Sequence, residues 1–272
     1  MDVYNRLWEL RDKRVDGWPL MESFQPTLYI CIGYVLVAKA LGPFYMKNRN
    51  AYELYGWIRL YNIIQVLASL YMFLGLMNNG ASCDSLELPF WLPGAFPKLC
   101  QNVETSSDPN SPGMKMAVLC WWCYLSKILD FMDTFFFIFK KKFTHISYLQ
   151  VIHHAIMPLF GWALVRFLPG GQETFGGAIN ALVHVFMYSY YFLSSLGPRV
   201  QRLLWWKKYL TQIQMLQFTA VFFKCLTNIF GLVDCGYPWQ FSLLTASIMA
   251  ILFALFFNFY LENYRQKTMK QG

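Results

Sequence analysis

Residues 149–167 read LQVIHHAIMPLFGWALVRF, a long apolar run that contains two adjacent histidines. If this run is helical, Gln150, His153 and His154 occupy positions i, i+3 and i+4 and share one face. A polar ring in apolar surroundings is costly unless it has a partner or a task. The run therefore predicts a membrane helix that carries either a buried, hydrogen-bonded histidine pair or a catalytic face.

The composition of the whole chain is that of a membrane protein. Of its 272 residues, 56% are hydrophobic and only 14% are charged, whereas a soluble domain carries about 25% charged residues. Apolar runs of roughly 20 residues recur along the chain. We therefore predict an all-α polytopic membrane protein that forms a single transmembrane domain over residues 1–272, with seven transmembrane helices. The predicted spans are residues 27–45, 61–79, 115–139, 146–168, 174–196, 210–232 and 238–260.

The net charge of +8 arises from cations in the loops between the apolar runs. This placement is typical of membrane topology and argues against a nucleic-acid-binding surface. The basic connectors alternate with the acidic 80–114 loop and the short turns near residues 169–171 and 234, and the positive-inside rule makes the basic set cytosolic. Residues 1–26 are polar, predict no cleavable signal peptide, and fall on the far side of the membrane from the cytosol, while the basic tail 261–272 is cytosolic. The basic connectors contain Lys47, Arg49, Arg59, Lys140, Lys141, Lys142, Arg199, Arg202, Lys207 and Lys208.

Cysteine placement under this topology predicts one disulfide. Cys100 and Cys235 fall in far-side loops, in an oxidising compartment where a bond between them is permitted. Cys83 is the competing partner. Cys120 and Cys123 form a CxxC pattern, but they lie in an apolar helix, which favours a packing role.

Polar side chains inside the predicted spans are candidates for function. Counted at about 1.5 Å per residue from the cytosolic ends, those of spans three to six lie at depths of roughly 9 Å to 20 Å, with Asn180 one turn deeper. This coincidence predicts one buried polar chamber that opens to the cytosol. For Lys127 and Asp130, at i and i+3, an ion pair on the helix face is the alternative. The chamber residues are Asp130, Asp133, His153, His184, Asn180, Gln214 and Gln217.

Two other function classes fit the sequence poorly. A membrane diiron oxygenase needs about eight histidine ligands, and this chain has four histidines in all. A single metal on His153, His154 and His184 is awkward, because adjacent helical residues point roughly 100° apart. A seven-span receptor is disfavoured because Phe139-Lys140-Lys141-Lys142 stands where a DRY-like triplet would follow span three.

The chain resembles the very-long-chain fatty acid elongases, membrane 3-ketoacyl-CoA synthases of the endoplasmic reticulum. The resemblance spans nearly the whole chain and rests on four motifs in order, similar to the family's KxxExxDT, HxxHH, HxxMYxYY and TxxQxxQ. In this sequence they read Lys127-x-x-Asp130-x-x-Asp133-Thr134, Gln150-x-x-His153-His154, His184-x-x-Met187-Tyr188-Ser189-Tyr190-Tyr191 and Thr211-x-x-Gln214-x-x-Gln217.

The resemblance implies that helices two to seven ring a closed substrate tunnel. It implies condensation of an acyl-CoA with malonyl-CoA to a 3-ketoacyl-CoA, with release of CO2 and CoA, and a location in the endoplasmic reticulum membrane. It implies no metal and no cofactor beyond these substrates. The expected partners are membrane lipids and acyl-CoA, the other enzymes of the elongation cycle and a second copy of the chain, and not nucleic acid.

The resemblance places the reaction centre at His153, His154 and His184. Neutral imidazole is nucleophilic near neutral pH and also leaves well, so His153 or His184 is expected to carry the acyl group. A ternary complex with histidine as a base is the alternative mechanism. The developing oxyanions need donors, for which a histidine, Asn180, Gln150 and Tyr188 are candidates.

The cations of the basic loops are candidates to bind the phosphates of CoA. The alternative explanation for these cations is the positive-inside rule, under which they only set the orientation of the protein in the membrane. The CoA-binding candidates are Lys140, Lys141, Lys142, Arg199, Arg202, Lys207 and Lys208.

Two motifs depart from the family pattern. Asp130 stands where the family has Glu, and Gln150 stands where it has the first histidine of its box. Glutamine donates and accepts hydrogen bonds but is neither a base nor a nucleophile. Gln150 is therefore expected only to orient its neighbours. A catalytically impaired, lipid-binding family member is the alternative function.

Overall fold

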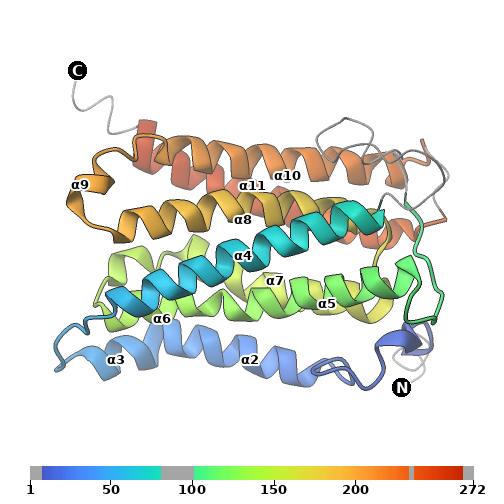
Figure 1. Ribbon diagram of the computed structural model, residues 1–272, viewed down its shortest axis with the longest axis horizontal. Coiled ribbons are helices and arrows are strands. Elements are labelled where there is room, and N and C mark those ends of the chain that lie inside the picture. Colours follow the sequence, from blue (N-terminus) through green and yellow to red (C-terminus); the bar gives the residue numbers. More distant parts are fainter. Residues whose placement is uncertain (1–7, 81–100, 233–235, 266–272) are drawn as a thin grey trace. The chain divides into compact units, whose positions relative to one another are not determined.

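All regular secondary structure among the described residues is helical. The computed structural model describes residues 8–80, 101–232 and 236–265, and these ranges contain no strand (Figure 1). Cys83, Cys100 and Cys235 lie outside them, so the predicted disulfide stays a prediction. The chain separates into two compact units, one drawn from residues 1–53, 79–87 and 101–174 and the other from residues 54–78, 88–100 and 175–272.

The long helices of the first unit pack on α7. α2 packs against α7, α5 packs against α7, and α3 packs against α6. Its elements are η1 (Lys13–Val15), α2 (Gln25–Leu36), the π-helix η2 (Val37–Leu41), α3 (Gly42–Met46), α5 (Pro112–Leu129), α6 (Phe131–Phe139), η3 (Phe143–His145), α7 (Tyr148–Phe167) and η4 (Gly171–Glu173).

The second unit contains the remaining helices. α10 and α11 form its most extensive contact, which includes edge-to-face packing of Phe218 on Phe256 with ring centroids 5.1 Å apart. Its elements are α4 (Tyr55–Gly80), α8 (Thr174–Ser195), α9 (Pro198–Gln201), α10 (Lys207–Ile229), α11 (Trp239–Tyr260) and the π-helix η5 (Leu261–Arg265).

The helices identify a membrane protein. Each predicted span coincides with a helical segment, and among the described residues four helical segments are long and apolar enough to cross a membrane. The seven-span topology and the tunnel stay predictions. The four segments are Gln25–Met46, Tyr55–Asn78, Tyr148–Phe167 and Trp239–Tyr264.

The predicted span 115–139 is helical along its length but is divided into two helices at Asp130. α5 ends at Leu129 and α6 begins at Phe131, with Asp130 between them. One turn earlier, the hydroxyl of Ser126 donates to the backbone carbonyl of Cys123 at 2.7 Å. A serine that bonds back to the preceding turn competes with the helix and often bends it. The break leaves Asp130 at a helix junction, where it joins the two halves of the motif.

The polar N-terminal segment folds onto the first unit. Val15 and Met21 are fully buried and pack in one cluster with Tyr124 of α5 and Trp162 of α7. The indole nitrogen of Trp162 donates to the carbonyl of Leu20 at 2.9 Å. Such burial of apolar side chains is the main favourable term in folding. The segment is therefore part of the helical unit, which its mixed charge alone does not reveal.

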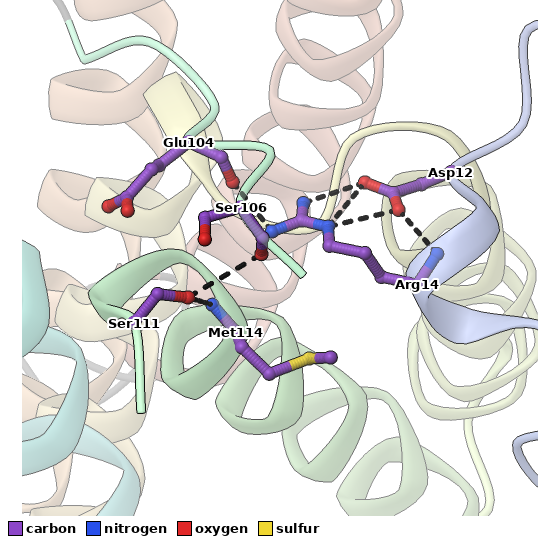
Figure 2. A network of polar contacts seen from close by, with 6 residues as sticks. All are labelled: Asp12, Arg14, Glu104, Ser106, Ser111 and Met114. Carbon is purple, nitrogen blue, oxygen red and sulfur yellow. Dashed lines mark hydrogen bonds and ion pairs between the residues drawn. The ribbon is translucent and has the colours of Figure 1, made fainter. Parts of the chain in front are cut away.

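The buried side chain of Arg14 fixes this segment to the residues that precede α5 (Figure 2). Arg14 pairs with Asp12 at 2.6 Å, and both side chains are less than a tenth exposed. Arg14 also donates to the backbone carbonyl of Glu104 at 2.6 Å. Nearby, the hydroxyl of Ser111 caps α5 by accepting from the N–H of Met114 at 3.1 Å. The buried guanidinium thus links two segments far apart in sequence.

A second pair involves the nearly fully buried Arg166 of α7. Its guanidinium donates to the carboxylate of Asp16 at 2.5 Å and lies over the ring of Trp8, 4.7 Å from the centroid. The hydrogen bond from Arg166 is the main reason that the pKa of Asp16 lies below its ordinary value, and the positive charges of Arg166 and Arg11 lower it further.

We expect Arg14→Ala to destabilise the protein strongly, because the change leaves the carboxylate of Asp12 buried without its partner. Losing one partner of a buried pair costs about 3–5 kcal/mol. The test is thermal unfolding of the detergent-solubilised protein, with the exposed neighbour Lys13→Ala as the control. Equal unfolding midpoints for the two variants would contradict a structural role for Arg14.

We expect Asp16→Asn to lower the unfolding midpoint at neutral pH, with a difference from wild type that disappears in acid. A carboxyl group whose pKa is lowered by folding stabilises the folded state above its unfolded pKa, and this contribution is lost as pH falls through the folded pKa. The measurement is the midpoint of both proteins between about pH 7 and about pH 3. A difference that is constant over this range would show that the charge of Asp16 contributes nothing.

Candidate functional site

The first turns of α7 carry the glutamine and both adjacent histidines. Ser147 caps the helix by accepting from the backbone N–H of Gln150 at 3.1 Å. This start fixes the register so that Gln150 and His154 meet, and the amide nitrogen of Gln150 lies 2.9 Å from Nε2 of His154. The rings of His153 and His154 are edge-to-face, with centroids 5.6 Å apart. The expected shared face is present.

The contact between Gln150 and His154 determines where the proton of His154 lies. An amide nitrogen has protons to donate and no lone pair to offer. Nε2 of His154 must therefore accept, which places the ring proton on Nδ1. The second amide proton of Gln150 points to the hydroxyl of Thr134, 3.4 Å away. Gln150 thus holds one tautomer of His154 and occupies its Nε2 lone pair.

The same network reaches the first long helix of the chain. The hydroxyl of Tyr34 in α2 lies 2.9 Å from the hydroxyl of Thr134, and both residues are buried. The ring of Tyr34 stacks on Phe131 with centroids 4.1 Å apart. Sequence reasoning missed Tyr34, although a hydroxyl within an apolar span was a usable signal. α2, α6 and α7 therefore meet through a chain of hydrogen bonds that ends at His154.

The acidic motif lies at the break between α5 and α6. Lys127 pairs with the buried Asp130 at 3.4 Å, so the ion pair offered as the alternative for these residues is present. Asp133 is half-buried in the first turn of α6. His153 is also half-buried, and its Nδ1 atom is shielded from solvent. All of these groups belong to the first unit.

The three lysines after α6 differ in their surroundings. The amine of Lys141 donates to the backbone carbonyls of Arg49 and Lys47, at 2.8 Å and 3.4 Å, and so holds the preceding loop in place. Partial burial, together with the positive charge of Lys142, lowers the pKa of Lys140. Lys142 is exposed. An anion near Lys140 and Lys142 would relieve this repulsion.

The second unit contains His184 and the residues of the two later motifs. His184 and Tyr188 of α8 are both buried, with their rings edge-to-face and centroids 5.6 Å apart. Asn180 is half-buried one turn before His184. The hydroxyl of Tyr188 lies 3.4 Å from that of Tyr61 in α4, a residue outside all four motifs. Sequence reasoning did not select Tyr61 or its neighbour Gln65.

α10 supplies the last motif and part of the basic set. Gln217 is buried, and the amide of the half-buried Gln214 contacts the sulfur of Met187 at 3.6 Å. The remaining CoA-binding candidates have exposed side chains, as positive-inside loops require. These exposed cations are Arg199, Arg202, Lys207 and Lys208.

The predicted site residues thus form two groups, one in each unit. Within each unit the structure brings histidine together with amide or hydroxyl partners. The chamber that would unite His153 with His184 stays a prediction. Among the described residues, no cluster of three His, Cys, Asp or Glu side chains is arranged to hold a metal ion.

These features define a class: a helical membrane protein whose apolar helices carry histidines beside amide and hydroxyl side chains. Comparison with known proteins gives the family. The family model described as ELO, the GNS1/SUR4 family, matches residues 19–272. A very long chain fatty acid elongase of Aedes aegypti is 42% identical over 262 residues, which cover 96% of this chain and 69% of the relative.

Two vertebrate relatives are also very long chain fatty acid elongases. Very long chain fatty acid elongase 2 of Rattus norvegicus is 40% identical, over 96% of this chain and 87% of the relative. Very long chain fatty acid elongase 4 of Homo sapiens is 36% identical, over 100% of this chain and 82% of the relative. The chain therefore belongs to the very long chain fatty acid elongase family, which confirms the resemblance stated from its motifs.

We expect His154 to carry its proton on Nδ1 in the wild-type protein and to lose this preference in Gln150→Leu. The leucine removes the amide that donates to Nε2, so the two tautomers become closer in free energy. The measurement is solid-state NMR of protein labelled with ¹⁵N-histidine, in which protonated and unprotonated ring nitrogens differ in shift. His154→Gln identifies the signal, and an Nε2-protonated ring in wild type would contradict the assignment.

Proposed function

We propose that this protein is a fatty acid elongase that condenses a long-chain acyl-CoA with malonyl-CoA to give a 3-ketoacyl-CoA, CO2 and CoA. Its classification would be very-long-chain 3-oxoacyl-CoA synthase. The observation that carries the proposal is membership of the elongase family over residues 19–272. The histidines of α7 and α8 support it, because an acyl transfer needs a nucleophile or a base.

The hydrogen bond at His154 favours a division of roles among the histidines. Gln150 occupies Nε2 of His154, so this ring is suited to support its neighbour rather than to attack a carbonyl. His153 and His184 are then the nucleophile candidates. A ring nitrogen attacks the thioester carbonyl, the C–S bond breaks, and CoA departs as the thiol with the ring proton. The product is an acyl-imidazole.

The second step forms the new carbon–carbon bond. Malonyl-CoA loses CO2, and the electron pair of the broken bond gives the enolate of acetyl-CoA. The enolate carbon attacks the acyl carbon, the C–N bond breaks, and the imidazole leaves and regains one proton from the medium. A water-poor site protects the acyl-imidazole from hydrolysis. In the alternative mechanism, both substrates bind together and histidine acts as a base without a covalent intermediate.

Other parts of the chain take supporting roles in this proposal. Helices two to seven ring a closed tunnel for the acyl chain, and the exposed cations at the helix ends bind the phosphates of CoA. Lys140 and Lys142 favour an anion more than Lys141 does, because the amine of Lys141 already holds two carbonyls.

The proposed location is the endoplasmic reticulum membrane, with a luminal N-terminus and a cytosolic C-terminus. The reaction needs no metal and no cofactor beyond its substrates. The proposed partners are membrane lipids, the other enzymes of the elongation cycle and a second copy of the chain.

The direct test uses membranes that contain the expressed protein, malonyl-CoA and a panel of saturated and unsaturated acyl-CoAs. The readout is the 3-ketoacyl-CoA product, measured by mass. Membranes from the same host without the protein are the control. A panel that gives no product above this control, with the protein folded, would overturn the proposed condensation and favour a lipid-binding role.

We expect His153→Ala and His184→Ala each to lower condensation by about a hundredfold, the range for losing a general acid–base group. Expression and folding are expected to stay near wild type, because each change removes one polar ring. The measurement is product formation at equal amounts of folded protein. Condensation that survives the double variant would exclude histidine catalysis.

Variants of Gln150 test the same site, with smaller expected losses of activity. Gln150→Ala is expected to lower activity less than either histidine change, because it removes an orienting hydrogen bond and leaves the reacting rings in place. Gln150→His is expected to retain activity, because its ring N–H can donate to Nε2 of His154 in the same way. A loss in Gln150→His as large as in His153→Ala would contradict the orienting role.

A further inference from the structure

The connector between α8 and α10, residues 196–209, exposes large apolar side chains. Leu203 and Trp205 are 70% and 74% exposed, and Tyr209, in the first turn of α10, is 42% exposed. The connector includes the short helix α9 and joins the ends of α8 and α10 (Figure 1). Exposed apolar side chains grouped among polar residues mark a surface that binds a protein or a membrane.

The connector is held in place by contacts with α8 and the rest of its own unit. Leu204 is buried, and the half-buried ring of Trp206 packs edge-to-face on Tyr190 of α8, with centroids 5.2 Å apart. These two side chains face their own unit, whereas the adjacent Leu203 and Trp205 face away from it. The exposure of Leu203 and Trp205 is therefore set by the fold.

Positive charge surrounds these exposed side chains. Residues 196–209 contain four cations and no acidic residue. The four cations have exposed side chains, and among the described residues none of them forms an ion pair. The amine of one cation lies over the ring of Tyr209, 4.9 Å from the centroid. The connector is thus complementary to an anionic surface. Its cations are Arg199, Arg202, Lys207 and Lys208.

The combination of apolar side chains and cations fits a lipid surface. Tryptophan and tyrosine are enriched where hydrocarbon meets water, because each has an apolar ring and a polar tip. Clusters of about four to eight Lys and Arg residues beside a membrane segment attract anionic lipid headgroups. The connector lies between the predicted spans 174–196 and 210–232, at the level where such headgroups are found.

The phosphates of CoA are the other anions that these cations can bind. CoA phosphates account for the cations but give no reason for an exposed leucine among them, because a phosphate offers no apolar surface. A lipid accounts for both, since its phosphate meets the cations and its acyl chains meet Leu203 and Trp205. The adenine of CoA can stack on a tryptophan ring, so CoA is a separate arm of the test.

We propose that the connector between α8 and α10 is a lipid-binding surface at the cytosolic interface of the bilayer. Leu203 and Trp205 insert between lipids, and the four cations bind the phosphates of anionic lipids. The side of the membrane follows from the positive-inside rule. The inference goes beyond the proposed condensation, and it leaves Lys140 and Lys142 as the candidates for the phosphates of CoA.

The test uses the full-length protein in phosphatidylcholine vesicles that contain a varied fraction of brominated lipid. Bromine quenches tryptophan fluorescence on contact, and the difference between wild type and Trp205→Phe isolates the signal of Trp205. We expect brominated phosphatidylserine to quench this signal at lower fractions than brominated phosphatidylcholine does. Bromine near the headgroup is expected to quench more than bromine at the chain end, because an interfacial ring lies at the shallow level.

Charge variants test the part played by the cations. Arg199→Gln combined with Arg202→Gln is expected to weaken the preference for phosphatidylserine by roughly fivefold to thirtyfold, because each cation near an anionic surface contributes about fivefold. The matched control is Lys13→Gln combined with Lys115→Gln, which removes two exposed cations from the other unit. The control is expected to keep the preference of wild type at Trp205.

Three results would overturn the inference. A Trp205 signal that no brominated lipid quenches would place this surface against water or a protein partner. Equal quenching by the two lipids would show that the cations select no anionic headgroup. Displacement of phosphatidylserine from Trp205 by added CoA, or a raised KM for malonyl-CoA with an unchanged lipid preference in Arg199→Gln with Arg202→Gln, would assign the cations to CoA.

The fluorescence measurement needs no turnover. Its outcome is therefore independent of the condensation assay, and failure of the proposed function is distinguishable from failure of this inference. Preferential, shallow quenching of Trp205 by phosphatidylserine, weakened in the charge variant and kept in the control, supports the lipid-binding surface.

Discussion

The need to satisfy polar groups inside apolar helices shapes both units of this protein. Water is scarce in a bilayer, so a buried hydroxyl, amide or imidazole must find its partner in the chain. In the first unit this requirement joins α2, α6 and α7 through Tyr34, Thr134, Gln150 and His154. Each hydrogen bond restricts a side chain, so the network that joins the helices also orients the imidazole of His154.

The same requirement explains the buried cations at the other end of α7. Arg166 is 1% exposed and meets Asp16 from a segment 150 residues earlier. Arg14 meets Asp12 and the backbone of Glu104. The ion pair of Arg166 holds the N-terminal segment against α7, and the hydrogen bond from Arg14 holds it to the residues before α5. That segment in turn packs on Tyr124 and Trp162. The polar N-terminus therefore belongs to the folded unit.

Local sequence predicts part of this architecture. Apolar runs locate the long helices, and Ser147 and Ser111 mark helix starts because their hydroxyls cap the following N–H groups. The helix spacing of Gln150 and His154 predicts their contact. Tyr34 and Tyr61 were not predicted, since a tyrosine in an apolar span packs equally well as an aromatic ring. The break at Asp130 was missed because it depends on how Ser126 bonds to the preceding turn.

The glutamine at position 150 can orient a neighbouring side chain by hydrogen bonding, but it does not titrate. A histidine at this position changes its charge and its donor pattern as it titrates, whereas an amide keeps the same donors at every pH at which the protein folds. With Gln150 donating to Nε2 of His154, the tautomer of His154 is fixed by a group that does not titrate. The ring that packs edge-to-face on His154 is that of His153, so a fixed His154 gives its neighbour a constant electrostatic environment. The departure from the family motif therefore keeps a hydrogen-bond donor to Nε2 of His154 at this position.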